Sequence, residues 1–348
     1  MTDVPRSGGS RLRALLLPLV AVGAGLAALA VGLLLAGYDP LLGLGALWRG
    51  AFGSWYAFAS GTLVRAVPLV LIGLAVAFAM TGGALNIGGE GQFYAGAIAA
   101  TWAGLHADGW PVAAALAVPA LAGALAGAAW IAVPVLLKVR FGVLEVISTL
   151  LLTFTAESLV SLMVTGPLQE AQGIAPQSDP IARLAQLPTW PGTRMHAGVL
   201  VAIIACVVAW WVVRRTAWGF ALRATGAGAR AAAISGNIDT VRVAATALFV
   251  SGALAGLAGA MEVQGVSYAL YQNLSPGYGF TAIAVALLAR QSMLGVLATG
   301  LLFGALEAGA GAMQREAGMP SVVVLVAEAV IIAAVLLAER ATRQAEAA

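Results

Sequence analysis

The sequence predicts an all-α polytopic membrane protein with about ten transmembrane helices, built as a single domain over residues 1–348. Of these residues, 61% are hydrophobic and only 9% are charged, whereas soluble domains carry about 25% charged residues. The mean hydropathy of +0.95 agrees, and several uncharged runs are long enough to cross a bilayer. A water-soluble fold of this length could not cover its surface with so few charges.

The expected spans are apolar runs of about 20 residues, the length of helix that crosses a hydrocarbon core about 30 Å thick. The first run, 14–38, is longer than the apolar part of a cleaved signal peptide, so we expect an uncleaved anchor helix. In chain order the ten spans are expected at 14–38, 66–89, 91–107, 109–137, 143–164, 197–213, 243–261, 277–290, 294–312 and 320–338.

The distribution of positive charge favours ten spans. With the N-terminus in the cytoplasm and the sides alternating, 13 of the 18 basic residues fall inside and 5 outside, which obeys the positive-inside rule. Both termini are then cytoplasmic. The inside set is Arg6, Arg11, Arg13, Lys138, Arg140, Arg214, Arg215, Arg223, Arg230, Arg242, Arg290, Arg340 and Arg343. The outside set is Arg49, Arg65, Arg183, Arg194 and Arg315.

Two connections are longer than turns. The outer loop, about 165–196, contains five prolines, which prevent long helices, and a short surface helix is expected in it at 181–187. The inner loop, about 215–241, has Ala-rich helical stretches broken by Gly226, Gly228 and Gly236. We therefore expect this cytoplasmic loop to hold a short helix between hinges.

Small residues recur at helical spacing in three spans. Glycines four residues apart let helix backbones approach closely in lipid, although a chain with 43 glycines also produces such pairs by chance. The pairs are Gly123 with Gly127, Gly252 with Gly256, and Gly300 with Gly304.

The most unusual stretch runs from Thr81 to Gln92 and holds Asn86 and Glu90 between two apolar helices. Non-helical backbone at membrane depth is tolerated only where protein or a water-filled cavity satisfies it. A second interrupted stretch lies at 272–279. Each follows the first helix of a four-helix unit (the second to fifth and the seventh to tenth helices), which is the pattern of an inverted repeat with broken helices. The alternative is two ordinary polar turns.

Four acids lie inside the expected spans, where charges are costly and usually face a cavity or a partner. They either line a pathway or hold helices together as neutral carboxyls, and the pattern leaves both open. Arg65 is the one basic residue placed to pair with a deep acid. The four acids are Glu145, Glu157, Glu307 and Glu328.

Several chemistries find little support. A Walker A loop needs a lysine after glycine, but the only lysine, Lys138, follows Val-Leu-Leu, so any ATP hydrolysis must occur on a separate subunit. The two histidines, His106 and His196, are far apart and no Cys/His cluster exists, so we expect no metal and no cofactor. No basic run with aromatics suggests nucleic acid. A serine protease using Ser251 or Ser148 would lack a nearby base.

Several phrases resemble ABC importer permeases of the ribose and branched-chain-amino-acid superfamily, and within it the nucleoside and simple-sugar subgroup. GALNIGGEGQFYAGAIAA at 83–100 is similar to the family signature NIG-EGQ-GA, and FGVLEVISTL at 141–150 is similar to FG-NEVI-TLMLN. Residues 219–237 resemble the coupling loop, and GYGFTAIAVALLAR with the later LGVLATGLLFGAL resembles the stretch that follows it. The order of these matches, from about 70 to 310, is specific. The sequence departs from the pattern at Leu144 and Thr153, where asparagines are usual, and at 227–229, where Asn-Pro is common.

The resemblance implies a permease subunit of an ATP-binding-cassette importer that moves nucleosides or related simple sugars across the inner membrane by alternating access. It also implies cytoplasmic ATPase subunits, an extracytoplasmic substrate-binding protein, and a second permease that forms a heterodimer with this chain. Residues 226–238 would form the helix that docks on the ATPase. The implied substrate-pathway residues are Asn86, Glu90, Gln92, Glu145, Ser148, Thr149, Thr153 and Tyr278. The implied coupling residues are Arg223, Gly226, Arg230, Ala231, Gly236 and Asn237.

The alternative function is an ion-coupled secondary transporter of a small polar solute, driven through Glu157 or Glu328. It predicts uptake that collapses with the proton gradient and needs no ATPase partner.

Overall fold

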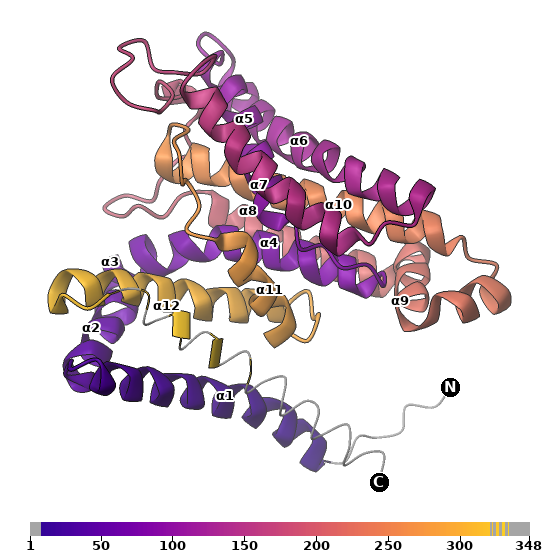
Figure 1. The fold of residues 1–348 in the computed structure, drawn as a ribbon, viewed down its shortest axis with the longest axis horizontal. Helices are drawn as coiled ribbons and strands as arrows, with labels where there is room; N and C mark the ends of the chain where they lie inside the picture. The colour runs from indigo at the N-terminus through magenta and orange to yellow at the C-terminus, as the bar shows by residue number, and fades with distance from the viewer. Residues whose placement is uncertain (1–7, 321, 323–324, 327–328, 331–332, 334–348) are drawn as a thin grey trace. The chain divides into compact units, whose positions relative to one another are not determined.

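The computed structural model describes residues 8–320, 322, 325–326, 329–330 and 333, and its named elements are all helical (Figure 1). In this described part, β-structure is limited to two isolated bridges, Gln177 with Tyr271 and Thr189 with His196. The chain divides into two compact units, one over Leu63–Gly304 and the other formed by Met1–Thr62 with Ala305–Ala348. We call them the central unit and the terminal unit.

The central unit holds the longer apolar helices. Its α-helices are α4 (Leu63–Thr81), α5 (Gly89–Leu105), α6 (Val112–Phe141), α7 (Glu145–Val164), α8 (Gly198–Arg215), α9 (Ala217–Gly236), α10 (Thr240–Glu262) and α11 (Tyr278–Leu288). A 3-10 turn, η2 (Arg183–Ala185), lies between α7 and α8, and a π-helical turn, η3 (Val263–Ser267), extends α10. Helix α12 (Gly295–Ala317) begins in this unit and continues into the terminal one.

The terminal unit contains helices that sequence analysis did not anticipate. After α1 (Gly8–Leu35) come α2 (Pro40–Phe52), α3 (Trp55–Ala57) and the π-helical η1 (Phe58–Thr62). Helix α2 starts where Asp39 accepts hydrogen bonds from the next amides, at 2.8 Å from Leu41 N, and where proline occupies the first turn. Its other end is tied to α12 by an ion pair between Arg49 and Glu316 at 2.9 Å. The list of expected spans contains none over 39–65.

The expected spans agree with the helices in position more than in length. Each expected span that ends before residue 313 contains a helix, whereas 320–338, with Glu328, lies largely outside the described residues. Among the residues that the structure describes, six helices are long and apolar enough to cross a membrane, and α5 and α11 are shorter. The span expected at 66–89 is wrong at its end, because the helix stops at Thr81 and the glycine-rich 82–88 segment is not helical.

The two long connections agree with expectation to different degrees. The inner connection, α9, is two helical pieces separated by non-helical backbone at Gly228, and the second piece ends at Gly236, so a short helix lies between glycines as expected. In the outer connection the expected surface helix at 181–187 is a single 3-10 turn, and Ile181 and Ala185 are buried. Burying the apolar side chains of Ile181 and Ala185 stabilises the fold more than forming a short helix would, because a short segment has only a weak intrinsic preference for helix.

Glycines bring three helices of the central unit into backbone contact. A Cβ atom at Gly96 in α5 would collide with the carbonyl oxygen of Gly256 in α10, and one at Gly127 in α6 would collide with that of Gly252. A Cβ at Gly256 would in turn meet the Gly123 carbonyl of α6. Two of the three expected glycine pairs therefore form a real helix interface, in which van der Waals contact replaces the hydrophobic driving force that lipid cannot supply.

Candidate functional site

The candidate pathway starts at a sharp turn after α4. Gly83 has a φ of +75°, a conformation that side chains disfavour, and the amides of Gly82 and Ala84 bond back to Ala79. The chain then runs unwound through 85–88 and re-enters helix at Gly89. This turn allows polar side chains to enter the packed interior without breaking a continuous helix.

Asn86 lies at the centre of a fully buried hydrogen-bond network. Its amide nitrogen donates to Gln92 Oε1 and to Ser251 Oγ, both at 2.8 Å. Its amide oxygen accepts from Gly88 N and from Gln92 Nε2, both at 3.0 Å. All four hydrogen-bonding positions of the Asn86 amide are therefore occupied. The network joins the unwound segment, α5 and α10, and it engages Ser251 as an acceptor.

Glu90 connects the two interrupted stretches, 81–92 and 272–279. Its carboxylate accepts a hydrogen bond from Gly279 N in the first turn of α11, and the Ser275 side chain bonds to it as well. The first turns of α5 and α11 thus meet at one carboxylate that is 2% exposed. Helix N-termini carry partial positive charge, so both helix ends favour an anion at this point.

Aromatic rings flank the Glu90 carboxylate. Tyr278 is buried at the start of α11 and meets Phe93 edge-on, with centroids 6.1 Å apart. Tyr94 OH points to the Ser275 carbonyl oxygen at 3.5 Å. Flat aromatic faces beside hydrogen-bonding groups suit a ligand that has both a ring and hydroxyls.

The hydroxyls of α7 face the start of α5. Thr149 and Thr153 are buried, and a Cβ at Gly88 would come within 2.8 Å of Thr149 Cβ. Both hydroxyls bond within their own helix, Thr153 to the Thr149 carbonyl at 3.2 Å. Ser148 likewise bonds to the Glu145 carbonyl at 3.2 Å. Thr149 and Thr153 therefore meet the start of α5 by van der Waals packing, while their hydroxyls bond within α7.

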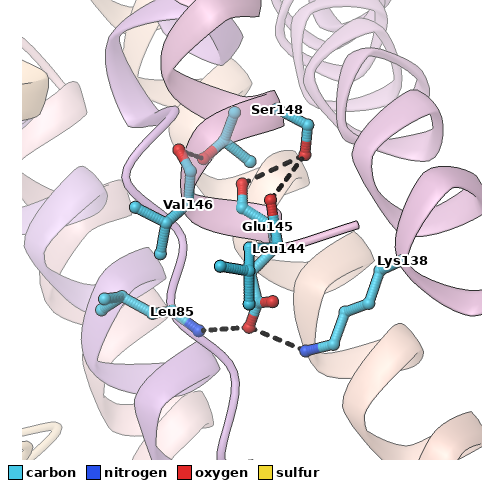
Figure 2. Close-up of polar contacts among 7 residues, drawn as sticks. Leu85, Lys138, Leu144, Glu145, Val146 and Ser148 are labelled. Atoms are coloured by element: carbon cyan, nitrogen blue, oxygen red, sulfur yellow. Dashed lines mark hydrogen bonds and ion pairs between the residues drawn. The ribbon is translucent and has the colours of Figure 1, made fainter. Parts of the chain in front are cut away.

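Glu145 belongs to a separate contact at the first turn of α7. Figure 2 shows its carboxylate between the Lys138 ammonium, at 2.7 Å, and the Leu85 amide, at 3.4 Å. Lys138 lies in the last turn of α6, and Gly142, with φ +67°, turns the chain between them. The contact therefore ties the α6–α7 hairpin to the unwound segment. Sequence analysis did not pair these residues, although both flank one helix break.

Helix α9 has a packed half and an exposed half. In the first half, Trp218 stacks on Phe78 of α4, and a Cβ at Gly226 would strike the Thr81 carbonyl oxygen. Beyond the Gly228 bend, Arg230 and Ala231 are exposed, and the helix ends at Asn237 in the left-handed conformation. Figure 1 shows α9 beyond the C-terminal end of α4 and the N-terminal end of α10.

Sequence reasoning missed a buried carboxylate at the other end of α10. Glu262 is 6% exposed and interacts with the charges of Arg65 and Arg194. The apolar pattern ended the span at Met261, so Glu262 was taken to lie outside it. The basic residue expected to meet a deep acid, Arg65, therefore meets this one. Glu157 is exposed on α7.

Residues 58–335 match the family model described as the branched-chain amino acid transport system / permease component. The chain belongs to this family. It is 39% identical over 328 residues to the guanosine ABC transporter permease protein NupP of Bacillus subtilis, covering 92% of this chain and 93% of the relative. It is 36% identical to the glucose ABC transporter permease protein TsgB13 of Haloferax volcanii, covering 90% and 86%.

The nucleoside ABC transporter permease protein NupB of Lactococcus lactis is 31% identical to the permease over 92% of this chain and 91% of the relative. A second guanosine permease of Bacillus subtilis, NupQ, is 26% identical over 251 residues. No solved structure matches the permease. The polar network, the Glu145 contact and the first half of α9 all lie within the part that matches the family model.

Proposed function

We propose that this chain is the membrane permease of an ABC importer for nucleosides or related simple sugars. The observation that carries the proposal is similarity over nine-tenths of the chain to permeases named for guanosine, nucleosides and glucose. Nothing comparable favours an ion-coupled carrier. Of the two acids expected to drive such a carrier, Glu157 is exposed on α7 and Glu328 lies outside the described residues.

ATP hydrolysis is assigned to separate cytoplasmic subunits, and solute delivery to an extracytoplasmic binding protein. The chain's only lysine is engaged with Glu145 and follows no glycine-rich loop. The second permease is proposed to be a different but related chain, since the guanosine permeases NupP and NupQ of one organism both resemble this one.

The proposed arrangement in the membrane has ten spans in one permease domain, with both termini in the cytoplasm. The meeting of two shortened helices, α5 and α11, at Glu90 supports an inverted repeat with broken helices, because such repeats place half-helix ends at the solute path. The outer connection at 165–196 then faces the binding protein.

The proposed solute path runs past Asn86, Glu90 and Gln92, with Tyr278 across from them and the hydroxyl face of α7 at its side. These groups, with Ser148, Thr149 and Thr153 on the α7 face, are buried in this arrangement, each at 7% exposure or less, whereas Glu145 is only half-buried. Opening the path would require the first turn of α11 to leave Glu90. The freed carboxylate and amides could then bond a sugar hydroxyl or a base edge, and the rings could stack on a base.

The proposed coupling route starts at the exposed half of α9, which holds Arg230, Ala231, Gly236 and Asn237. Ile234 there is 76% exposed, which suits docking on an ATPase surface. A movement of the exposed half, caused by the ATPase, would reach the solute path through the packed half of α9. Gly226 in that half contacts the backbone of the turn at 81–83, which leads to Asn86. The ATPase can reorient the permease only if it binds the exposed half of α9 more tightly in one of its two positions than in the other.

Substrate competition tests the transported class. The permease would be reconstituted with its ATPase, its second permease and its binding protein, and ATP-dependent uptake of labelled guanosine would be measured. We expect unlabelled nucleosides or glucose to reduce this uptake and leucine to leave it unchanged. Uptake of leucine without uptake of nucleosides or glucose would refute the proposed class.

Substitution in α9 tests coupling. In Arg230→Gln and Gly236→Ala we expect ATP hydrolysis to continue while uptake per ATP falls several-fold. The matched control is Arg140→Gln, an exposed arginine at the end of α6, which should keep wild-type coupling. Wild-type coupling in both α9 variants would remove the role assigned to this helix.

A further inference from the structure

A polar cavity lies in the central unit, apart from the hydrogen-bond network around Asn86. It has a volume of about 560 Å³ and opens where four elements end or bend. These are the last turn of α4, the last turn of α8, the middle of α9, and the turn between α11 and α12. Its lining residues are Met80, Thr81, Trp210, Val213, Arg214, Arg223, Gly226, Ala227, Arg290, Gln291, Ser292, Met293 and Leu294.

The lining is strongly cationic. Arg214, Arg223 and Arg290 contribute three guanidinium groups, and the described residues of the lining include no aspartate or glutamate. Arg214 lies in the last turn of α8, where a cation also offsets the negative end of the helix. Arg223 has no such role because it lies inside α9, five residues before the Gly228 bend.

Arg223 also has an unmet hydrogen-bond donor. Its Nη1 is buried and has no partner among the described residues. A buried donor left without an acceptor costs about 1–3 kcal/mol, so a structure retains one where a ligand or a bound group supplies the acceptor. An oxyanion is the natural acceptor, because a guanidinium bonds phosphate through two parallel N–H groups.

The turn beside Arg223 is conformationally unusual. Arg290 and Gln291 both adopt left-handed backbone angles, with φ of 52° and 59°. Successive non-glycine residues in this region are disfavoured and concentrate at binding and switch sites. The turn presents Arg290 and Ser292 to the cavity.

The cavity also has an apolar wall. Trp210, Met293 and Leu294 contribute apolar wall next to the arginines. A cavity of this size exceeds what a single carboxylate fills, and its mixed lining suits a phosphate joined to a short apolar or glycerol portion. Basic pockets between helix ends on the cytoplasmic side bind anionic lipid headgroups by this chemistry.

We propose that this cavity binds a phosphate-bearing anion, held by Arg223 with Arg214 and Arg290, and that this site is distinct from the solute path. The ligand is either the headgroup of an anionic phospholipid or a water-soluble phosphate monoester. The proposal does not depend on which solute the permease moves.

Direct binding measurements test the site. The full-length permease in detergent would be equilibrated with two kinds of probe. Phosphatidylglycerol binding would be counted by native mass spectrometry, and radiolabelled inorganic phosphate and glycerol 3-phosphate would be followed by equilibrium dialysis. We expect saturable binding of one equivalent in at least one arm. Lipid binding alone assigns the membrane as the source, and binding of soluble phosphate assigns the cytosol.

Three variants give the test its specificity. Arg223→Gln keeps the side chain polar but removes the charge, and we expect binding to weaken about tenfold or more, as loss of a charged hydrogen bond predicts. Arg214→Gln, at an exposed position that folding tolerates, should weaken binding in the same direction. Arg140→Gln is the matched control, since Arg140 also lies in the last turn of a long helix but outside the cavity.

The proposal is overturned if no probe binds saturably, or if Arg223→Gln and Arg214→Gln both bind like the wild type. It is equally overturned if Arg140→Gln weakens binding as much as they do, because the attraction would then belong to the whole basic surface. Should Arg223→Gln fail to fold, the comparison of Arg214→Gln with Arg140→Gln decides the question.

Discussion

Removing the ion pair between Lys138 and Glu145 should loosen the α6–α7 hairpin from the unwound segment at 85–88. The ammonium and carboxylate are 2.7 Å apart, and their side chains are 32% and 13% exposed. Coulomb attraction at that distance is about 6 kcal/mol at an effective dielectric of 20 and about 1.5 kcal/mol in bulk water. The partial exposure of Lys138, and the desolvation of both groups, move the net value toward the lower figure.

We therefore expect a coupling free energy of about 2 kcal/mol between these two residues. Glu145→Gln keeps the size of the side chain and an oxygen that can accept from Leu85 N, so it removes the charge and little else. Lys138→Met keeps the apolar stem. The two variants and their double variant form a thermodynamic cycle, which isolates the pair when each change removes only that contact.

The assay is reversible unfolding of the purified permease in mixed micelles, titrated with SDS and followed by tryptophan fluorescence. High salt provides a second readout, because 1 M NaCl shortens the screening length to about 3 Å and should reduce the coupling in the wild type. A coupling energy below about 0.5 kcal/mol, the range in which unrelated sites add, would refute the reasoning. The ion pair shown in Figure 2 would then not stabilise the attachment of the α6–α7 hairpin to the unwound segment.

Three further changes have expected outcomes. Gly256→Ala should lower the free energy of unfolding by about 1–3 kcal/mol, because the added Cβ would collide with the backbone of Gly123 and Gly127. Gly23→Ala is the control, since no atom lies near that position, and it should not lower the stability. Equal stability in both variants would contradict the close packing at Gly256. Asn86→Ala should lower the free energy of unfolding by about 3 kcal/mol or more, because it leaves its buried hydrogen-bond partners without a partner. The same unfolding titration measures this loss, and a smaller loss than in Ser251→Ala would argue against Asn86 as the centre of the network. Burial lowers the pKa of His196 from 6.5 to about 4, so the unfolded chain binds a proton that the folded chain refuses, and stability falls as pH drops through this window. Between pH 7 and pH 5 the wild type should lose about 2 kcal/mol more than His196→Gln, and parallel pH curves would contradict that account.

The positions of most helices could be predicted, because the length of an uncharged apolar run is enough to indicate a membrane-spanning helix. The runs that became α6, α7, α8 and α10 were found within a few residues of their ends. Helix α2 escaped prediction because its thirteen residues include Arg49 and are too few to span a membrane. Its cap at Asp39 and Pro40 was nevertheless readable as a helix start.

The polar residues of the network could be predicted from the sequence, but their partners could not. Asn86, Glu90 and Gln92 stood out because polar residues and glycines interrupted apolar sequence, and the structure brings Asn86 and Gln92 together. Their pairing with Ser251 and Gly279 could not be predicted, because each partner lies more than 150 residues away, although Gly279 belongs to the second interrupted stretch. Pairing across such distances follows from packing, here from the glycine contacts between α5 and α10, and no local pattern encodes it.

The Glu262 carboxylate shows where a rule based on spans fails. Counting apolar residues places a charged residue outside the membrane as soon as the run ends, at Met261. Helix α10 runs on to Glu262, and the π-helical turn η3 continues from Val263, so Glu262 lies within a continuous helix and is buried. Hydropathy marks the end of an apolar run, which is not the end of the helix here.

The most direct test of the account is solute accumulation in proteoliposomes with and without the ATPase subunits. The permease, its second permease and the binding protein would be reconstituted in both preparations, with ATP supplied on the ATPase side. The account predicts accumulation of labelled guanosine above the outside concentration only when the ATPase is present and ATP is hydrolysed. Concentrative uptake by the permeases without any ATPase, driven by a proton or sodium gradient, would contradict it.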